Sequence, residues 1–124
     1  MTVMSKPALT FADTLEVRDA CLCLHVQRAA RALARRFDQA LAPAGLTNGQ
    51  FSLLMALNRP APPPMRAVAA VLGQDRTTLT AALKPLERRG LVVSAPDPAD
   101  RRSRLLGLTE AGRERLTEAL PIWR

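Results

Sequence analysis

The stretch that decides the fold is residues 65–90, MRAVAAVLGQDRTTLTAALKPLERRG. It predicts two helices, residues 65–72 and 75–89, joined by a tight turn at Gly73, which is the pattern of a helix-turn-helix. Asp75 is placed to cap the second helix at its start. The leucines of that helix recur at i, i+4 and i+7 and are expected to pack inward: Leu79, Leu83 and Leu86.

Polar and basic side chains dominate a second face of the helix 75–89, roughly 130° from the leucines at about 100° per residue. Such a face fits a DNA major groove, where side chains near the helix N-terminus reach base edges and later cations meet phosphates. The alternative is that the face is merely solvated. The candidate DNA contacts in this helix are Arg76, Thr77, Thr78, Thr80, Lys84 and Arg88.

A β-hairpin is expected directly after this helix. Residues 91–95 are a β-branched run typical of a strand, residues 96–101 have the composition of a turn, and residues 103–108 form the returning strand. Basic residues at the tip would let the hairpin act as a wing in a minor groove. Asp100 is expected to accept from backbone N–H groups of the turn or to hold one Arg in a bidentate pair. The candidate DNA contacts in the wing are Arg101, Arg102 and Arg104.

Composition and charge agree with a helical protein that meets a polyanion. The 124 residues carry 18 Lys and Arg against 11 Asp and Glu, a net charge of +7. Between Arg76 and Arg104 there are seven cations and three anions, so over half of the excess falls on the helix and hairpin. Because only 3% of residues are aromatic, the core must come from Leu, Ala, Val and Met, which favour a single mainly α domain.

The rest of the chain divides around a DNA-binding lobe of residues 47–108. Residues 1–14 show no period and are expected to form a flexible arm. A long helix from about Leu15 to Ala42 carries one apolar stripe, so residues 15–46 are expected to be a dimerisation helix, with residues 109–124 as a second one. The stripe can pack within its own subunit or on a partner: Leu22, Val26, Ala29, Leu33, Phe37 and Ala40.

Three further signals mark boundaries. Pro43 should end the long helix, and Thr47 with Gln50 three residues later has the form of a capping box for the next one. Residues 58–64 are a proline-rich loop, expected to be too polar for a core. Pro121 is expected to interrupt the last helix shortly before its end.

The segments DRTTLTAALKPLERRGLV, residues 75–92, and DPADRRSRLLGLTEAG, residues 97–112, resemble the signature stretch of the MarR family of bacterial winged-helix regulators. The resemblance covers roughly residues 20–120. It implies a winged helix-turn-helix, with the helix-turn-helix at 65–89 and the wing at 91–108. It further implies a homodimer that binds a palindromic operator in double-stranded DNA, as a repressor of transcription that a small anionic aromatic ligand releases.

The resemblance also bears on single positions. Arg102 would be the wing-tip residue that approaches the minor groove, with Asp100 as its support. Related sequences often carry polar or basic residues where this helix has Ala81 and Ala82, so the base sequence it recognises stays open. Family members usually continue through a longer C-terminal helical region, so the dimerisation helix 109–124 is expected to be short.

Two sets of residues are candidates for regulation. An effector pocket between the dimer helices and the DNA-binding lobe has His25, Arg28, Phe37 and Gln50 as candidates, and the alternative for His25 is that it is an ordinary interface residue. Cys21 and Cys23 are candidate redox residues. On one helix they would project about 160–200° apart, so they could not bond to each other without unwinding of the helix. Pairing between subunits is possible, and the alternative, which we favour, is a role as small buried hydrophobes.

Other function classes find little support. One His and two Cys are too few for a zinc site, and no catalytic motif stands out, so neither an enzyme nor a cofactor is expected. The sequence has no apolar run near the roughly 20 residues that span a bilayer and no secretory h-region, so a cytoplasmic protein without a membrane partner is expected. The alternatives to a ligand-controlled regulator are one switched by cysteine oxidation and a constitutive DNA-associated protein.

Overall fold

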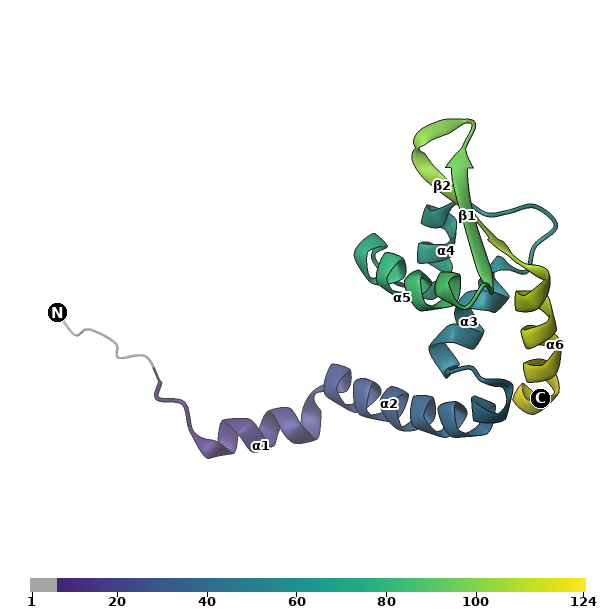
Figure 1. Cartoon of the computed structure of the whole chain (residues 1–124). Coiled ribbons are helices and arrows are strands. Elements are labelled where there is room, and N and C mark those ends of the chain that lie inside the picture. The colour runs from purple at the N-terminus through teal and green to yellow at the C-terminus, as the bar shows by residue number, and fades with distance from the viewer. Residues whose placement is uncertain (1–6) are drawn as a thin grey trace. The chain divides into compact units, whose positions relative to one another are not determined.

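Six α-helices, one 3-10 helix and a β-hairpin make up residues 7–124, the part of the chain that the computed structural model describes (Figure 1). The helices are α1 (Phe11–Ala20), α2 (Leu22–Leu41), η1 (Ala42–Ala44), α3 (Asn48–Leu57), α4 (Met65–Leu72), α5 (Arg76–Arg88) and α6 (Glu110–Trp123). The antiparallel strands are β1 (Val92–Asp97) and β2 (Asp100–Leu108). The expected class, mainly α with a small β-hairpin wing, is confirmed. The chain divides at Leu33 into two units, each described by itself below.

The first unit contains α1, which begins earlier than expected. Thr10 and Asp13 form a capping box, in which the Thr10 N–H donates to Asp13 Oδ2 over 2.9 Å and the Asp13 N–H donates to Thr10 Oγ1 over 3.3 Å. The expectation of a flexible arm is therefore wrong for residues 10–14, while residues 1–6 lie outside the described residues. Apolar periodicity did not reveal α1, because none of its residues is buried.

The expected continuous helix from residue 15 onward is interrupted at Cys21. Its backbone is extended, with ψ of 105°, although its N–H still donates to the Val17 carbonyl over 2.9 Å. α2 resumes at Leu22 and continues to Leu41. No Gly or Pro marks this break, so the sequence carried no breaker signal for it.

The second unit, residues 34–124, begins with the end of α2 and the turn into α3. Pro43 falls within η1, as expected for a helix end, and Gly45 follows in a left-handed conformation with φ of 73°. The predicted capping box of α3 is confirmed: the Gln50 N–H donates to Thr47 Oγ1 and the Thr47 N–H donates to Gln50 Oε1, both over 3.1 Å.

The helix-turn-helix follows the sequence prediction closely. Gly73, with φ of 64°, ends α4, and Asp75 Oδ1 accepts from the Thr78 N–H over 2.7 Å at the start of α5. Gly90, with φ of 72°, allows the sharp exit toward β1. The three leucines expected to face inward are buried: Leu79, Leu83 and Leu86.

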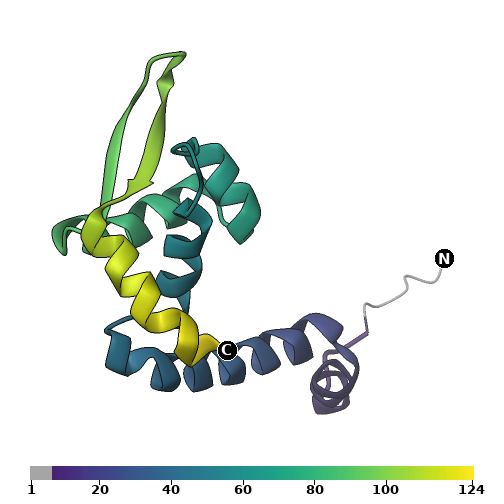
Figure 2. The same cartoon turned by 90° about the vertical axis from the view of Figure 1, so that its right-hand side faces the viewer.

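The wing is longer than the sequence suggested. The expected turn over residues 96–101 is wrong, because β1 continues to Asp97 and β2 starts at Asp100, which leaves only Pro98 and Ala99 between them. Pairing runs from Val92 opposite Leu108 to Pro96 opposite Arg104. Figure 2 shows the hairpin extending well beyond α4 and α5, so its tip is free to reach a partner.

The proline-rich loop is attached to the wing rather than separate from it. Pro63 is buried, and its carbonyl accepts from the Leu106 N–H over 2.9 Å, while Pro64 forms a bridge with Leu105. The prediction that this loop stays out of the core is therefore wrong at its end. A proline cannot donate to a ladder, but its carbonyl can still accept, so an edge position is open to it.

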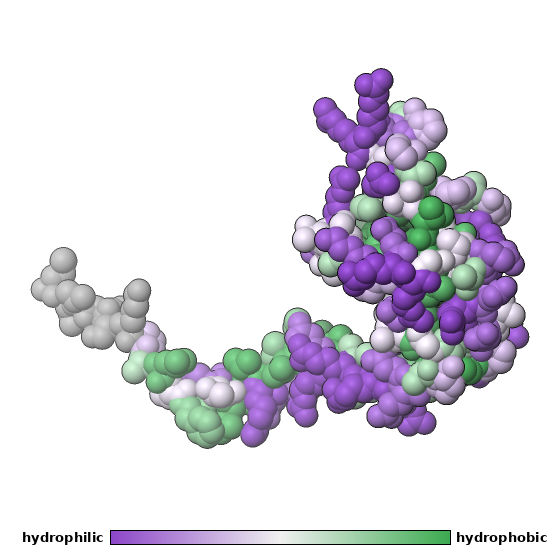
Figure 3. Space-filling view, viewed as in Figure 1, coloured by the Kyte–Doolittle hydropathy of each residue, from purple (hydrophilic) through white to green (hydrophobic). Residues whose placement is uncertain are grey.

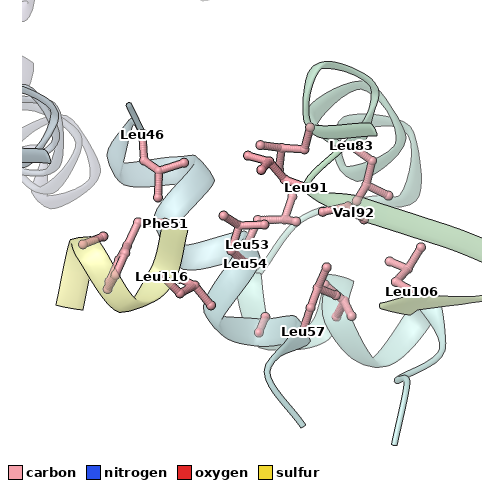
Figure 4. Packing of buried hydrophobic residues seen from close by; sticks show 14 of the residues in the cluster. Leu46, Phe51, Leu53, Leu54, Leu57, Leu83, Leu91, Val92, Leu106 and Leu116 are labelled. Carbon is pink, nitrogen blue, oxygen red and sulfur yellow. The ribbon is translucent and has the colours of Figure 1, made fainter. Parts of the chain in front are cut away.

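Leucines dominate the core of the second unit, and no buried polar or charged residue is found among the described positions. Figure 4 shows the leucines of α3 packed between side chains from α5, the hairpin and α6. α6 does not end at Pro121 as expected but continues to Trp123, although Pro121 has no N–H to donate to the carbonyl of Thr117 one turn earlier. The labelled core residues are Leu46, Phe51, Leu53, Leu54, Leu57, Leu83, Leu91, Val92, Leu106 and Leu116.

Candidate nucleic-acid interface

The polar face of α5 is open to solvent. All candidate contacts on it are exposed: Arg76, Thr77, Thr78, Thr80, Lys84 and Arg88. The hydroxyl of Thr80 donates to the Arg76 carbonyl over 2.8 Å, so its hydrogen is used within the helix and its oxygen is left as an acceptor. The buried leucines on the opposite side hold this face outward, as a helix that enters a groove requires.

Asp75 holds the first turn of α5 in place. Hydrogen bonds from the backbone N–H and the side chain of Thr78 hold the pKa of the Asp75 carboxyl below its ordinary value of 3.8, and a bond from the backbone of Thr77 acts in the same direction. The carboxylate also lies at the positive end of the helix dipole. Ionised Asp75 therefore positions Arg76 and Thr77, the residues expected nearest to base edges.

This cap predicts a pH dependence. Because the folded pKa of Asp75 lies below 3.8, the stabilisation of the α5 start is fully present above that pH and is lost as the pH falls through the folded pKa. An NMR titration should give an Asp75 midpoint below 3.8, with the Thr78 amide shift following it. Asp75→Asn should keep the cap and abolish the titration; a midpoint at or above 3.8 in the wild type would contradict the assignment.

The wing tip presents two arginines on a turn that two aspartates shape. Arg101 and Arg102 are exposed, and Figure 3 shows hydrophilic side chains extending from the tip. Asp97 Oδ1 accepts from the Ala99 N–H over 2.9 Å, and Asp100 Oδ1 accepts from the Arg102 N–H over 3.0 Å. Of the two roles considered for Asp100, this geometry realises the backbone one. The turn thus fixes the backbone and leaves both guanidinium groups available.

The third candidate in the wing, Arg104, is already partnered. Its Nε and Nη2 donate to Ser94 Oγ on β1 over 3.3 and 3.0 Å. These bonds lie across the hairpin, between neighbouring strands. Arg104 can therefore carry charge toward a polyanion, but its guanidinium also ties β1 to β2.

α5 and the wing are joined at their nearest point. Arg76 Nη2, from the first turn of α5, donates to the Arg102 carbonyl over 3.2 Å. These residues are 26 positions apart, so the bond sets the spacing between the two basic elements. Beside it lies a cleft of about 460 Å³ between α4, the start of α5 and β2, whose lining includes Arg66, Ala69, Gln74, Arg76, Asp100 and Arg102.

Comparison with known proteins agrees with this arrangement. A sequence model of the MarR family matches residues 44–103. The structure of the M. tuberculosis transcriptional regulator MosR in complex with DNA is 42% identical, with a TM-score of 0.77, and the match covers 84% of this chain and 75% of that one. The chain belongs to the MarR family.

Two further relatives show the range of the match. CouR, a transcriptional repressor solved on a 23-mer DNA duplex, is 34% identical with a TM-score of 0.73, over 94% of this chain and 79% of that one. The transcriptional activatory protein BadR of Rhodopseudomonas palustris is 36% identical over 74% of this chain and 54% of its own length. The chain thus spans about half the length of the first curated relatives it matches.

The four effector-pocket candidates divide between the two units of the chain. His25 and Arg28 are exposed in the first unit, and the His25 Nε2 lies 3.3 Å from the Asp19 carbonyl oxygen. Phe37 is half-buried in the second unit, and the carboxamide of Gln50 is occupied by the α3 capping box. The sequence signal for this capping role of Gln50 was the Thr47 and Gln50 spacing.

A different apolar cavity of about 450 Å³ lies between α3, α4 and α6. Phe51 and Trp123 line this cavity and stack on each other, with ring centroids 6.5 Å apart. Arg59 also lines it. No sequence pattern pointed to it, because the lining comes from three segments that are separate in the chain. Its remaining lining residues are Ser52, Met55, Ala56, Val71, Leu72 and Leu120.

The two cysteines are unpaired thiols in different settings. Cys21 is half-buried at the break before α2, and Cys23 is exposed and accepts from Gln27 Nε2 over 3.4 Å. The expectation of two small buried hydrophobes is wrong for Cys23 within this chain. Over the described residues, no group of three His, Cys, Asp or Glu side chains is arranged to hold a metal, and no helix is long and apolar enough to cross a membrane.

Proposed function

We propose that this chain is a sequence-specific DNA-binding transcriptional regulator, with α5 in a major groove and the wing in the adjacent minor groove. The observation that carries the proposal is the junction of the two basic elements, where Arg76 of α5 donates to the Arg102 carbonyl of β2. This hydrogen bond supports one continuous cationic surface over α5 and the wing. MosR and CouR, which share this fold, have been solved bound to DNA.

Selection of bound duplexes from a random pool tests this proposal. We expect a palindrome, and a specific affinity at least ~10³ times the non-specific one at physiological salt. A pool that shows no enrichment, with binding to all duplexes alike, would favour the alternative of a constitutive DNA-associated protein. We further propose repression as the direction of control, as in CouR, and a reporter placed behind the selected site would show it.

A homodimer is the assembly we propose. The apolar stripe of α2 is exposed in the single chain: Leu22 is 75%, Val26 55% and Leu33 57% accessible. Figure 3 shows hydrophobic surface along this helix. A helix that leaves large apolar side chains in water is stabilised by a partner, and a second copy also suits a palindrome.

Sedimentation equilibrium at micromolar concentration should therefore show a dimer. Val26→Glu, which puts a carboxylate into the stripe, is expected to give monomers with unchanged far-UV circular dichroism and much weaker operator binding. Arg31→Glu, on another face of α2, is the matched control and should remain dimeric. A wild type that stays monomeric in this range would contradict the assembly.

We propose that a small anionic aromatic ligand releases the DNA by occupying the cavity beside Trp123. CouR from Rhodococcus jostii RHA1 has been solved with p-coumaroyl-CoA, an aromatic thioester, bound. Here an apolar cavity with stacked Phe51 and Trp123 would accept a ring, and Arg59 would pair with a carboxylate. Aromatic carboxylates should raise the melting temperature of the wild type but not of Arg59→Gln; no shift with any of them would count against this site.

Cysteine oxidation is the second candidate for the switch. The extended backbone at Cys21 removes the helical geometry that would hold its side chain away from Cys23, and Cys23 is exposed to an oxidant. In the proposed step, peroxide oxidises both thiols to one S–S bond and is reduced to two waters, which lowers the protein mass by two hydrogens. Peroxide should then weaken DNA binding by the wild type and not by Cys21→Ser; equal binding before and after treatment would exclude this switch.

A further inference from the structure

The cleft between α4 and β2 is lined by more positive than negative charge. Arg66, Arg76 and Arg102 line it against a single carboxylate, that of Asp100. That carboxylate already accepts from the Arg102 N–H over 3.0 Å, as part of the wing turn. The cleft therefore has a net positive potential and space of about 460 Å³, with no bulky side chain filling it.

Part of the lining of this cleft is apolar. Ala69 and Ala70 of α4 and the buried Met65 contribute small or recessed side chains to the lining. An apolar wall under a rim of guanidinium groups matches the chemistry of a sugar-phosphate backbone, in which an apolar sugar ring alternates with a monoanionic phosphodiester. A purely ionic ligand such as free phosphate would leave this wall without a partner.

Gln74 adds an amide to the same lining. Its Oε1 is buried and has no hydrogen-bond partner among the described residues, which is unusual for a buried polar atom. Its amide group makes no hydrogen bond to another described side chain, so it is available to a ligand that enters the cleft. A phosphodiester oxygen would accept from the NH₂ of this amide, which is the donor half of the group.

The cleft is also held in shape before any ligand arrives. The bond from Arg76 Nη2 to the Arg102 carbonyl joins its two sides, and the bridge between Pro64 and Leu105 joins α4's N-terminal end to β2. Binding in a preformed site loses less conformational entropy than binding that must first order a loop.

We propose that this cleft seats one phosphodiester of the DNA backbone where the strand passes from α5 to the wing, with Arg66 as its charge partner and Gln74 as an amide donor. The inference rests on the proposed function and adds two residues to the interface that the sequence pattern did not single out. Arg66 lies in α4 and not in α5, so its contact would contribute affinity and register but no base specificity.

A salt titration of DNA binding tests the charge contact. Arg66→Ala should weaken binding severalfold and about equally for all sequences, and should reduce the slope of log K against log salt by about 0.9 for each protomer bound. Arg113→Ala, an equal loss of charge on α6 beside a different cavity, is the control and should change the slope much less. Equal slopes for the two variants would overturn the inference, whereas a wild type that binds no duplex would refute the proposed function itself.

Neutral phosphates locate the contact. The selected operator is scanned with methylphosphonates, each of which removes the charge of one phosphate. One substituted position per half-site should weaken DNA binding by the wild type but not by Arg66→Ala, because that variant already lacks the guanidinium that pairs with this phosphate. Gln74→Glu, which puts a carboxylate in the cleft, should weaken charged operator more than Gln74→Met does. If the losses from the methylphosphonate and from Arg66→Ala add at every position, the proposal is overturned. It is also overturned if inorganic phosphate shifts the Gln74 amide resonance while Arg66→Ala binds DNA normally, since that result assigns the cleft to a free anion.

Discussion

Arg102→Ala is expected to weaken binding to the selected operator by about 1–3 kcal/mol for each wing engaged, the range of a specific contact. The guanidinium is exposed at the hairpin tip, while the backbone that carries it is fixed by Asp100 and by Arg76. Truncation should therefore remove the contact without disturbing the turn. A fluorescence anisotropy titration at one salt concentration measures the loss.

Lys84→Ala is the variant to compare with Arg102→Ala. Lys84→Ala, on the outer face of α5, should weaken all sequences about equally and lower the salt slope by about 1, as a phosphate contact does. Arg102→Ala should instead lower the preference for the operator over a random duplex. Unchanged operator affinity in both variants would refute the assignment of α5 and the wing to the grooves.

Gly112→Ala is expected to lower the free energy of unfolding by about 3 kcal/mol, the upper part of the range for overpacking. A Cβ at this position would overlap the Leu91 carbonyl oxygen, a backbone atom that cannot rotate away, and would also press on a methyl of Leu108 at 3.2 Å. The Leu91 carbonyl accepts from the Thr109 N–H over 3.1 Å, so moving it would disturb the junction between α5, the wing and α6.

Gly49→Ala provides the matched control, because a Cβ there meets only Thr47 Oγ1 at 4.0 Å. Gly49 lies in the first turn of α3, where Ala is the better helix former by about 0.5–1 kcal/mol. Urea unfolding should thus show the Gly112 variant destabilised and the Gly49 variant equal to or more stable than the wild type. Identical urea midpoints for the Gly112→Ala and Gly49→Ala variants would contradict the predicted overlap of a Cβ at position 112 with the Leu91 carbonyl.

Local signals predicted the DNA-binding lobe well. Asp75, Gly73 and Thr47 act through hydrogen bonds or backbone conformations that reach only a few residues, so their roles were visible in the sequence. The inward face of α5 followed from its leucine spacing in the same way. The Thr10 capping box is an equally local signal, but it stands outside the apolar periodicity from which the long helix was predicted, because α1 has no buried residue.

Features made by distant segments could not be predicted in this way. Arg66 and Ser103 line one cleft although 37 positions separate them, and no spacing rule connects a helix to a strand at that distance. The cavity beside Trp123 has the same origin in three helices. The length of the wing was underestimated because Pro96 and Asp100 are typical of turns, whereas the ladder continues through Pro96 opposite Arg104 to Asp97 opposite Asp100.

The prolines that approach the wing have a consequence for solubility. The segment ending at Pro63 and Pro64 lies against β2 and accepts a hydrogen bond from Leu106. Because proline has no N–H, this outer edge offers few donors to a strand from another molecule. A long exposed hairpin is otherwise a template for edge-to-edge aggregation, so replacing these prolines should increase light scattering of concentrated protein before it changes DNA affinity.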